Sequence, residues 1–178
     1  MSSLSLNNKQ GIDRILDANI NRLKEGLRVC EEICRFILDE RGLTAELKSA
    51  RHDLDLLAAR LNRSGTLIRS RFTAEDVGRT VSASGEFSRR SCCDVFYANI
   101  QRVKESLRVL EEFAKLKDTR VAGGFKKARY RVYEIEKRAA FKLSGICPDR
   151  QASLRAKKYN NSGGRTPGRG RRAGPAQV

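Results

Sequence analysis

The stretch ANINRLKEGLRVCEE at residues 18–32 returns as ANIQRVKESLRVLEE at residues 98–112. A shorter echo follows each copy, as KSARHDL at residues 48–54 and KKARYRV at residues 126–132. Self-similarity on this scale is the signature of a repeated supersecondary unit. Because each copy contains two related segments, we expect the unit to be a helical hairpin that occurs twice.

Apolar residues recur in the first copy at the spacing of one helix face. On a wheel of about 100° per residue they form one broad stripe, which we expect to face the core. The stripe comprises Leu16, Ile20, Leu23, Leu27, Cys30, Ile33, Cys34 and Ile37. The periodicity therefore predicts an amphipathic helix, and the second copy predicts another.

Capping and breaking residues set the expected boundaries. Gly42 suits a left-handed helix terminus, and Ser91 with Asp94 has the spacing of a capping box. The expected helices span residues 12–39, 44–61 and 91–117, and a fourth that follows Gly123 and Gly124 and ends near Leu143. We therefore expect an all-α fold, a four-helix bundle made of a duplicated helical hairpin, with a long central loop at residues 62–90.

Composition agrees with one helical domain. The 178 residues are 39% hydrophobic, which is enough for one ordinary core, and no segment alternates long enough to predict a strand. We expect a helical domain at residues 11–143 and a basic, low-complexity, disordered tail at residues 144–178. Eight uncompensated basic residues from Arg150 onward account for half of the formal net charge of +16.

The apolar runs and the cysteines indicate in which cellular compartment the protein is expected. No run is long enough for a transmembrane helix, and the N-terminus has no signal-peptide core, so we expect a cytoplasmic protein. Five cysteines cannot all be bridged internally, and we expect them to be reduced. A zinc site is not predicted, because Cys92 and Cys93 are adjacent and Cys147 stands alone in the sequence.

Polar residues repeat beside the apolar stripe and form a polar seam along each copy. Asn19 falls inside the stripe, where an amide needs hydrogen-bond partners, and Gly26 leaves room for a neighbour to approach. Arg28 and Glu32 have the spacing of an ordinary solvated ion pair. The seam consists of Asn19, Arg22, Glu25, Gly26 and Glu32 in the first copy and Asn99, Arg102, Glu105, Ser106 and Glu112 in the second.

Arginines beside carboxylates favour a small phosphate ester with Mg²⁺ as the ligand. Guanidinium groups grip phosphate oxygens in pairs, and carboxylates hold the metal. Phosphoryl transfer to a phosphate needs no general base, so the single histidine is no objection. The chain has no P-loop motif. Two alternatives are a Mg²⁺-dependent helical nucleotide pyrophosphohydrolase and a non-enzymatic protein that binds nucleic acid through its basic tail.

Several separated motifs resemble the small helical hydroxymethylpyrimidine-phosphate kinase family of thiamine biosynthesis. They are Arg14 to Asn19, Glu25 to Glu32, Arg69 to Thr73, Asp76 to Gly78, Ser88 to Ser91, Ala98 to Glu112 and Lys126 to Tyr133. The resemblance implies a kinase that uses ATP and Mg²⁺ to convert the monophosphate into the diphosphate. It also implies a link to thiamine-phosphate synthase, to which this family is often fused as the N-terminal domain. Phe72 departs from the family, which usually has aspartate there, and Arg79 interrupts an expected Gly-Thr.

With this resemblance, we expect the polar seams and the central loop to hold the substrates. The arginines would bind phosphates, the glutamates would bind metal or orient the arginines, and the asparagines would bind the aminopyrimidine or brace the helices. The expected catalytic residues are Arg22, Arg71, Arg102, Glu25 and Glu105, the expected substrate-binding residues are Asn19, Asn99, Arg129, Asp76 and Gly78, and the expected metal ligands are Glu32 and Glu112. The matching side chains of both copies are expected to converge on one pocket.

Overall fold

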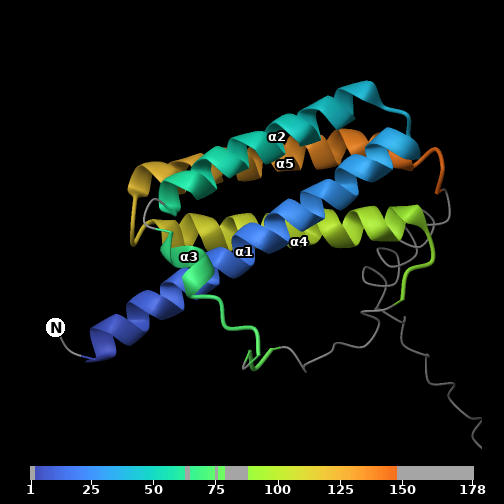
Figure 1. Ribbon diagram of the computed structural model, residues 1–178. Helices are drawn as coiled ribbons and strands as arrows, with labels where there is room; N and C mark the ends of the chain where they lie inside the picture. Colours follow the sequence, from blue (N-terminus) through green and yellow to red (C-terminus); the bar gives the residue numbers. More distant parts are fainter. Residues whose placement is uncertain (1–2, 63–64, 75, 79–87, 148–178) are drawn as a thin grey trace, which may run out of the picture.

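Two helical hairpins pack against each other in the computed structural model, which describes residues 3–62, 65–74, 76–78 and 88–147 (Figure 1). The first hairpin consists of α1 (Ser3–Phe36) and α2 (Arg41–Leu61), and the second of α4 (Cys92–Ala114) and α5 (Thr119–Leu143). α1 packs on α2 and α4, and α5 packs on α4 and α2, while the short α3 (Thr66–Arg69) lies against α1. The described residues contain helices and no strand, so the predicted all-α bundle is confirmed.

The duplicated stretches occupy equivalent places in the two hairpins. Residues 18–32 lie on α1 and residues 98–112 on α4, while the echoes lie on α2 and α5. The predicted stripe is largely buried, and Leu16, Leu27 and Cys30 have no exposed surface. Ile37 is an exception at 50% exposure, because α1 ends before it. The repeat therefore corresponds to two copies of one packing unit.

Close approach of α1 and α4 explains the small residue at Gly26. A Cβ atom on Gly26 would lie 2.8 Å from Cγ2 of Val103 and 3.0 Å from the backbone oxygen of Asn99. The room that the sequence predicted beside this glycine is therefore filled by the backbone of α4. Ser106, at the matching position of the second copy, is also buried.

Replacing Gly26 with alanine is expected to lower the free energy of unfolding by about 1 kcal/mol. Forcing a methyl group into this contact costs about 1–3 kcal/mol, which exceeds the gain of about 1 kcal/mol in helix propensity. Gly123→Ala is the control, since a Cβ there meets nothing within 4 Å, and it should stabilise the protein by about 0.5–1 kcal/mol. Urea unfolding measures both, and equal shifts of the same sign would contradict the contact.

Several predicted boundaries were wrong, each for a local reason. The turn after α1 takes its left-handed residue from Asp39, at φ 50°, whereas Gly42 lies inside α2. Gly123 and Gly124 lie inside α5, which Asp118 caps by accepting from two backbone N–H groups, and a Cβ on Gly124 would lie 2.5 Å from a methyl carbon of Leu57 on α2. Close helix packing, not helix breaking, therefore accounts for Gly124.

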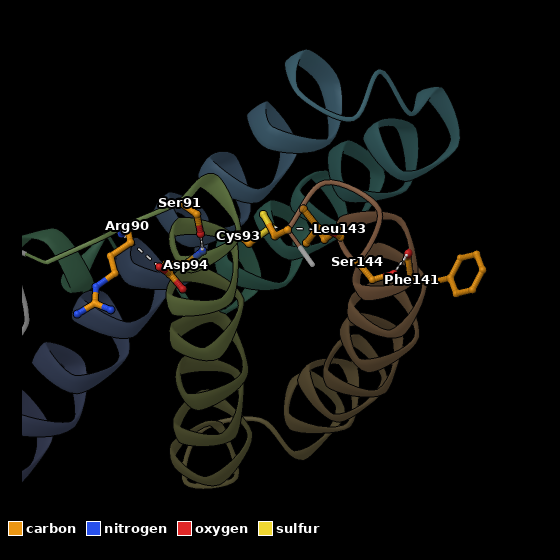
Figure 2. The surroundings of a disulfide bond; sticks show 8 residues. Arg90, Ser91, Cys93, Asp94, Phe141, Leu143 and Ser144 are labelled. Carbon is orange, nitrogen blue, oxygen red and sulfur yellow. Dashed lines mark hydrogen bonds between the residues drawn. A yellow bond between two sulfur atoms is a disulfide. The ribbon is translucent and has the colours of Figure 1, made fainter. Parts of the chain in front are cut away.

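The ends of α1 and α4 also differ from the prediction, whereas the predicted helix cap at Ser91 is confirmed. α1 begins at Ser3 rather than Ile12, and α4 ends at Ala114 rather than Lys117, while the predicted central loop contains α3. The Ser91 hydroxyl accepts from the backbone N–H of Asp94 at 3.2 Å, as the predicted capping box requires (Figure 2). Its reciprocal bond goes one residue further, from the N–H of Arg90 to the Asp94 carboxylate. The predicted tail beyond residue 147 and Arg79 lie outside the described residues.

Each hairpin is fastened by a buried ion pair at matching positions. In the first, Arg51 on α2 binds Glu31 on α1 at 3.0 Å, and in the second, Arg129 on α5 binds Glu111 on α4 at 2.9 Å. Both glutamates are nearly inaccessible, at 3% and 5% exposure. A buried carboxylate requires such a partner, and each ion pair joins the two helices of its hairpin.

Cys93 at the start of α4 and Cys147 just after α5 form a disulfide (Figure 2). The expectation that all cysteines are reduced is therefore wrong for this pair. The two residues are 54 positions apart, but the antiparallel α4 and α5 return the chain to the point where α4 begins. Among the helices of the described part, none has an apolar stretch long enough to span a membrane.

Candidate functional site

A cavity of about 570 Å³ lies between the part of α1 from Gly11 to Glu25 and the segment that follows α3. The first turns of the repeat and the start of the central loop therefore share one pocket. Its wall consists of Gly11, Arg14, Ile15, Asp17, Ala18, Asn19, Asn21, Arg22, Glu25, Arg71, Phe72, Thr73 and Asp76.

A bidentate ion pair holds the loop against α1. Nε and Nη2 of Arg71 donate to the two carboxylate oxygens of Asp17 at 2.7 and 2.9 Å. Asp17 is mostly buried, while Arg71 remains partly exposed on the pocket wall. The hydrogen bond to Asp17 raises the pKa of Arg71 above its ordinary value, so the guanidinium remains charged. The pair thus positions a permanent cation at the pocket.

Arg14 supplies a second cation and a contact to Phe72. Its guanidinium carbon lies 5.8 Å from the centre of the Phe72 ring, and its Nη2 donates to the Phe72 carbonyl at 3.4 Å. Phe72 stands where the resembling family usually has aspartate. In this chain that position contributes an aromatic face to the pocket and no carboxylate, so any metal ligand must come from another residue.

Asn19 and Asn99 brace their own helices. The side-chain nitrogen of Asn19 donates to the carbonyl of Ile15 at 2.9 Å, and that of Asn99 to the carbonyl of Val95 at 2.8 Å. Asn19 is buried at 7% exposure and lines the pocket, whereas Asn99 does not. No donor among the described residues is bonded to Oδ1 of Asn19, so this oxygen can accept from a ligand.

The structure brings together only part of the predicted site. Asn19, Arg22, Glu25, Arg71 and Asp76 share the pocket wall, and the N–H of Gly78 donates to Asp76 at 2.9 Å behind it. The remaining predicted residues do not line this pocket: Asn99, Arg102, Glu105, Glu112, Arg129 and Glu32. The two copies therefore do not contribute equally to one site.

The glutamates outside the pocket have local partners. Glu32 pairs with Arg28 at 2.7 Å, as its spacing predicted. Glu112 pairs with Arg108 at 3.0 Å and with Lys115 at 2.8 Å, and these cations hold the pKa of Glu112 below its ordinary value. Glu105 accepts from Gln101 at 2.8 Å. These contacts are those of surface charges on helices.

Two carboxylates on the pocket wall fit Mg²⁺ better than the predicted ligands Glu32 and Glu112. Glu25 and Asp76 are both exposed to the pocket, and proteins commonly hold Mg²⁺ with one or two carboxylates together with substrate phosphates. Carboxylates in the described part of the chain do not gather into a group of three that could enclose an ion alone. The donor set therefore suits a metal that arrives with a phosphate.

Asp17 and Arg14 were missed by the sequence analysis as site residues. Their counterparts in the second copy are Tyr97 and Asp94, so the repeat changes its chemistry at these two positions. Both residues belong to the motif from Arg14 to Asn19 that carries the family resemblance, and this motif, together with the break in the repeat, is the signal that could have found them.

The fold and the pocket define a duplicated helical-hairpin protein whose pocket wall carries three arginines, Arg14, Arg22 and Arg71, together with three carboxylates, Asp17, Glu25 and Asp76. Residues 14–138 match the ThiD2 family, and the chain belongs to that family. It is 40% identical over 146 residues to a thiamine-phosphate synthase of Rhodopirellula baltica, covering 82% of this chain and 39% of that protein. It is also 44% identical over 131 residues to a thiamine-phosphate synthase of Synechocystis sp., and this match covers 70% of this chain and 35% of that protein.

These relatives are much longer than the matched region. The chain spans between about a third and two fifths of their length. No solved structure matches the chain. The family and the relatives support the part of the resemblance that concerns thiamine biosynthesis.

Proposed function

We propose that this protein is a kinase that transfers the terminal phosphoryl group of ATP to hydroxymethylpyrimidine phosphate. The observation that carries the proposal is the presence of three arginines, Arg14, Arg22 and Arg71, on the wall of one pocket. Guanidinium groups bind phosphate oxygens in pairs and stay charged at every physiological pH. The family and the relatives support a role in thiamine biosynthesis, and the resemblance of the sequence motifs to the hydroxymethylpyrimidine-phosphate kinases suggests the pyrimidine as the carrier of that phosphate.

The reaction requires the protein mainly to hold the two substrates in position and to neutralise the charge of their phosphates. An oxygen of the substrate phosphate attacks the terminal phosphorus of ATP, a new P–O bond forms, and the bond to the bridging oxygen breaks with its electron pair leaving on ADP. A phosphate monoester is already ionised near neutral pH, so no side chain has to remove a proton. Arg22 and Arg71 would hold the phosphate and offset its charge as the transition state forms.

The other pocket residues suit the rest of the ligand. Oδ1 of Asn19 can accept a hydrogen bond from the amino group of the aminopyrimidine, and the Phe72 ring offers an apolar surface to its heterocycle. Glu25 and Asp76 would hold Mg²⁺ together with the phosphates. When bound, Mg²⁺ supplies further neutralisation of the phosphate oxygens.

An ADP-release assay tests the proposal directly. We expect ADP to form in the presence of hydroxymethylpyrimidine phosphate and kcat/KM to fall about 100-fold or more with the unphosphorylated pyrimidine, because the phosphate contacts of Arg22 and of the Arg71 nitrogen that Asp17 does not hold are then lost. Release of pyrophosphate from a nucleotide alone would support the pyrophosphohydrolase alternative instead. Salt-sensitive binding of duplex DNA with no turnover of either pyrimidine would support the nucleic-acid alternative.

We further propose that the product is used by thiamine-phosphate synthase. The Rhodopirellula baltica relative that carries this name matches this chain over 146 residues, which make up only 39% of its own length. Fusion of two activities in one chain is the arrangement expected when the product of one is the substrate of the other. Addition of a thiamine-phosphate synthase and its second substrate to the assay mixture should then consume the diphosphate, which chromatography of the products would detect.

A further inference from the structure

Three cysteines gather at the end of the bundle where α4 begins and α5 ends. Cys92 and Cys93 are the first two residues of α4, and Cys147 follows the last turn after α5. Their three Sγ atoms all lie within 4.8 Å of one another. Within the described ranges this is the one group of three or more side chains of metal-ligating type. We call these residues the thiol cluster.

The duplicated fold does not require thiols at these positions. The counterparts of Cys92 and Cys93 in the first copy are Ile12 and Asp13. A structural disulfide between Cys93 and Cys147 needs two sulfurs, and Cys92 is a third beside them. Neither the packing of the bundle nor the disulfide therefore accounts for all three.

The spacing of the sulfurs suits a single metal ion. Tetrahedral Zn²⁺ has Zn–S bonds of about 2.3 Å, which place two ligating sulfurs about 3.8 Å apart. Sulfurs within 4.8 Å of one another reach this spacing by small side-chain rotations once the disulfide is open. Three thiolates select soft cations such as Zn²⁺ over Mg²⁺ or Ca²⁺.

We propose that the reduced thiol cluster binds one Zn²⁺ ion through Cys92, Cys93 and Cys147. Cys92 and Cys147 are only half-buried, so a water molecule can take the fourth coordination position. The site is separate from the proposed phosphate pocket, because none of the three cysteines lines that pocket. The inference thus stands independently of the kinase proposal.

The metal and the disulfide exclude each other. A phosphine reductant gives two electrons to the Cys93–Cys147 bond and is itself converted to the phosphine oxide with an oxygen from water, whose two protons yield two thiols. Binding of Zn²⁺ then displaces three protons, one from each cysteine. Either linkage ties Cys147 to the start of α4, so this end of α5 is fastened to α4 in both states.

The other two cysteines differ in character from the thiol cluster. Cys30 is fully buried, and its Sγ lies against the carbonyl of Phe96. Burial raises the pKa of the Cys34 thiol to about 11, and burial raises that of Cys30 as well. Both therefore remain protonated thiols near neutral pH and compete poorly for metal.

Zinc binding by the full chain tests the proposal. The protein is reduced with a phosphine, freed of reductant without oxygen and titrated with Zn²⁺ against a chromophoric chelator. We expect one tightly bound zinc per reduced chain and none in the oxidised chain. Alkylation followed by mass spectrometry should show that zinc protects Cys92, Cys93 and Cys147.

Cys92→Ser is the decisive variant, because it removes the third sulfur and keeps the Cys93–Cys147 pair. Its zinc affinity should fall by more than about 100-fold, since loss of even an outer partner of a metal ligand costs 10- to 100-fold. Cys34→Ala is the matched control and should bind zinc as the parent does. Unchanged affinity in Cys92→Ser, or a reduced chain that takes up no zinc, would overturn the proposal and leave the cluster as a disulfide beside a third thiol.

Discussion

Replacing Arg22 with alanine is expected to lower kcat/KM for phosphoryl transfer about 100-fold. Arg22 lies one helical turn from Asn19 and shares the pocket wall with the Asn19 amide and the Arg71 guanidinium, which would contact the substrate. Removing one preorganised charged donor from a transition state costs about 10²–10³ in rate. Because Arg22 is exposed, its loss should leave the helix content and the unfolding midpoint unchanged.

Arg28→Ala provides the matched control for Arg22→Ala. Arg28 lies on the same helix, is also exposed, and pairs with Glu31 and Glu32 away from the pocket. Since Arg28 is half exposed and the buried Glu31 keeps Arg51 as its partner, deleting Arg28 should lower the free energy of unfolding by less than about 1 kcal/mol and should not alter turnover. Steady-state kinetics of both variants give the comparison. Equal loss of activity in the two variants would remove Arg22 from the site.

Arg102 shows how far the repeat predicts a site and where it stops. The duplication correctly predicted two equivalent helices, and Arg102 is exposed on α4 as Arg22 is on α1. The connecting segments, however, are not duplicated. Residues 71–73 and Asp76 follow the first hairpin and line a pocket on α1 that includes Arg22 but not Arg102. Helix periodicity predicts which face of a helix is buried. It does not predict which exposed face a long connecting segment will cover.

The buried glutamates illustrate a second limit. Glu31 and Glu32 are neighbours in the sequence, and the spacing to Arg28 drew attention to Glu32 as the partner. In the structure Glu31 is the buried one, because the arginine of the next helix reaches it across the hairpin. On a wheel of about 100° per residue, Glu31 falls beside Ile20 at one edge of the stripe, whereas Glu32 falls almost opposite its centre. The wheel therefore indicates which glutamate lies next to the core, but the partner Arg51 is set by the docking of α2, which the periodicity does not predict.

Replacing Arg129 with alanine is expected to lower the free energy of unfolding by about 3 kcal/mol. Arg129 donates to Glu111 at 2.9 Å and to the Tyr133 hydroxyl at 2.9 Å. Without it the Glu111 carboxylate, at 5% exposure, retains only the exposed Arg108, and breaking a buried pair on one side costs about 3–5 kcal/mol. Urea unfolding with a check for an unchanged slope measures this loss.

Arg131→Ala separates this structural role from a general effect of removing charge on α5. Arg131 pairs with Asp53 where both side chains are well exposed, so its loss should cost less than about 1 kcal/mol. If Arg129 binds the substrate, as the sequence predicted, Arg129→Ala should instead raise the KM for the phosphate substrate at temperatures where the variant is folded. If Arg129 instead joins α5 to α4, KM stays unchanged while stability falls, and Arg51→Ala in the first hairpin reproduces that pattern because Arg51 holds Glu31 in the same way.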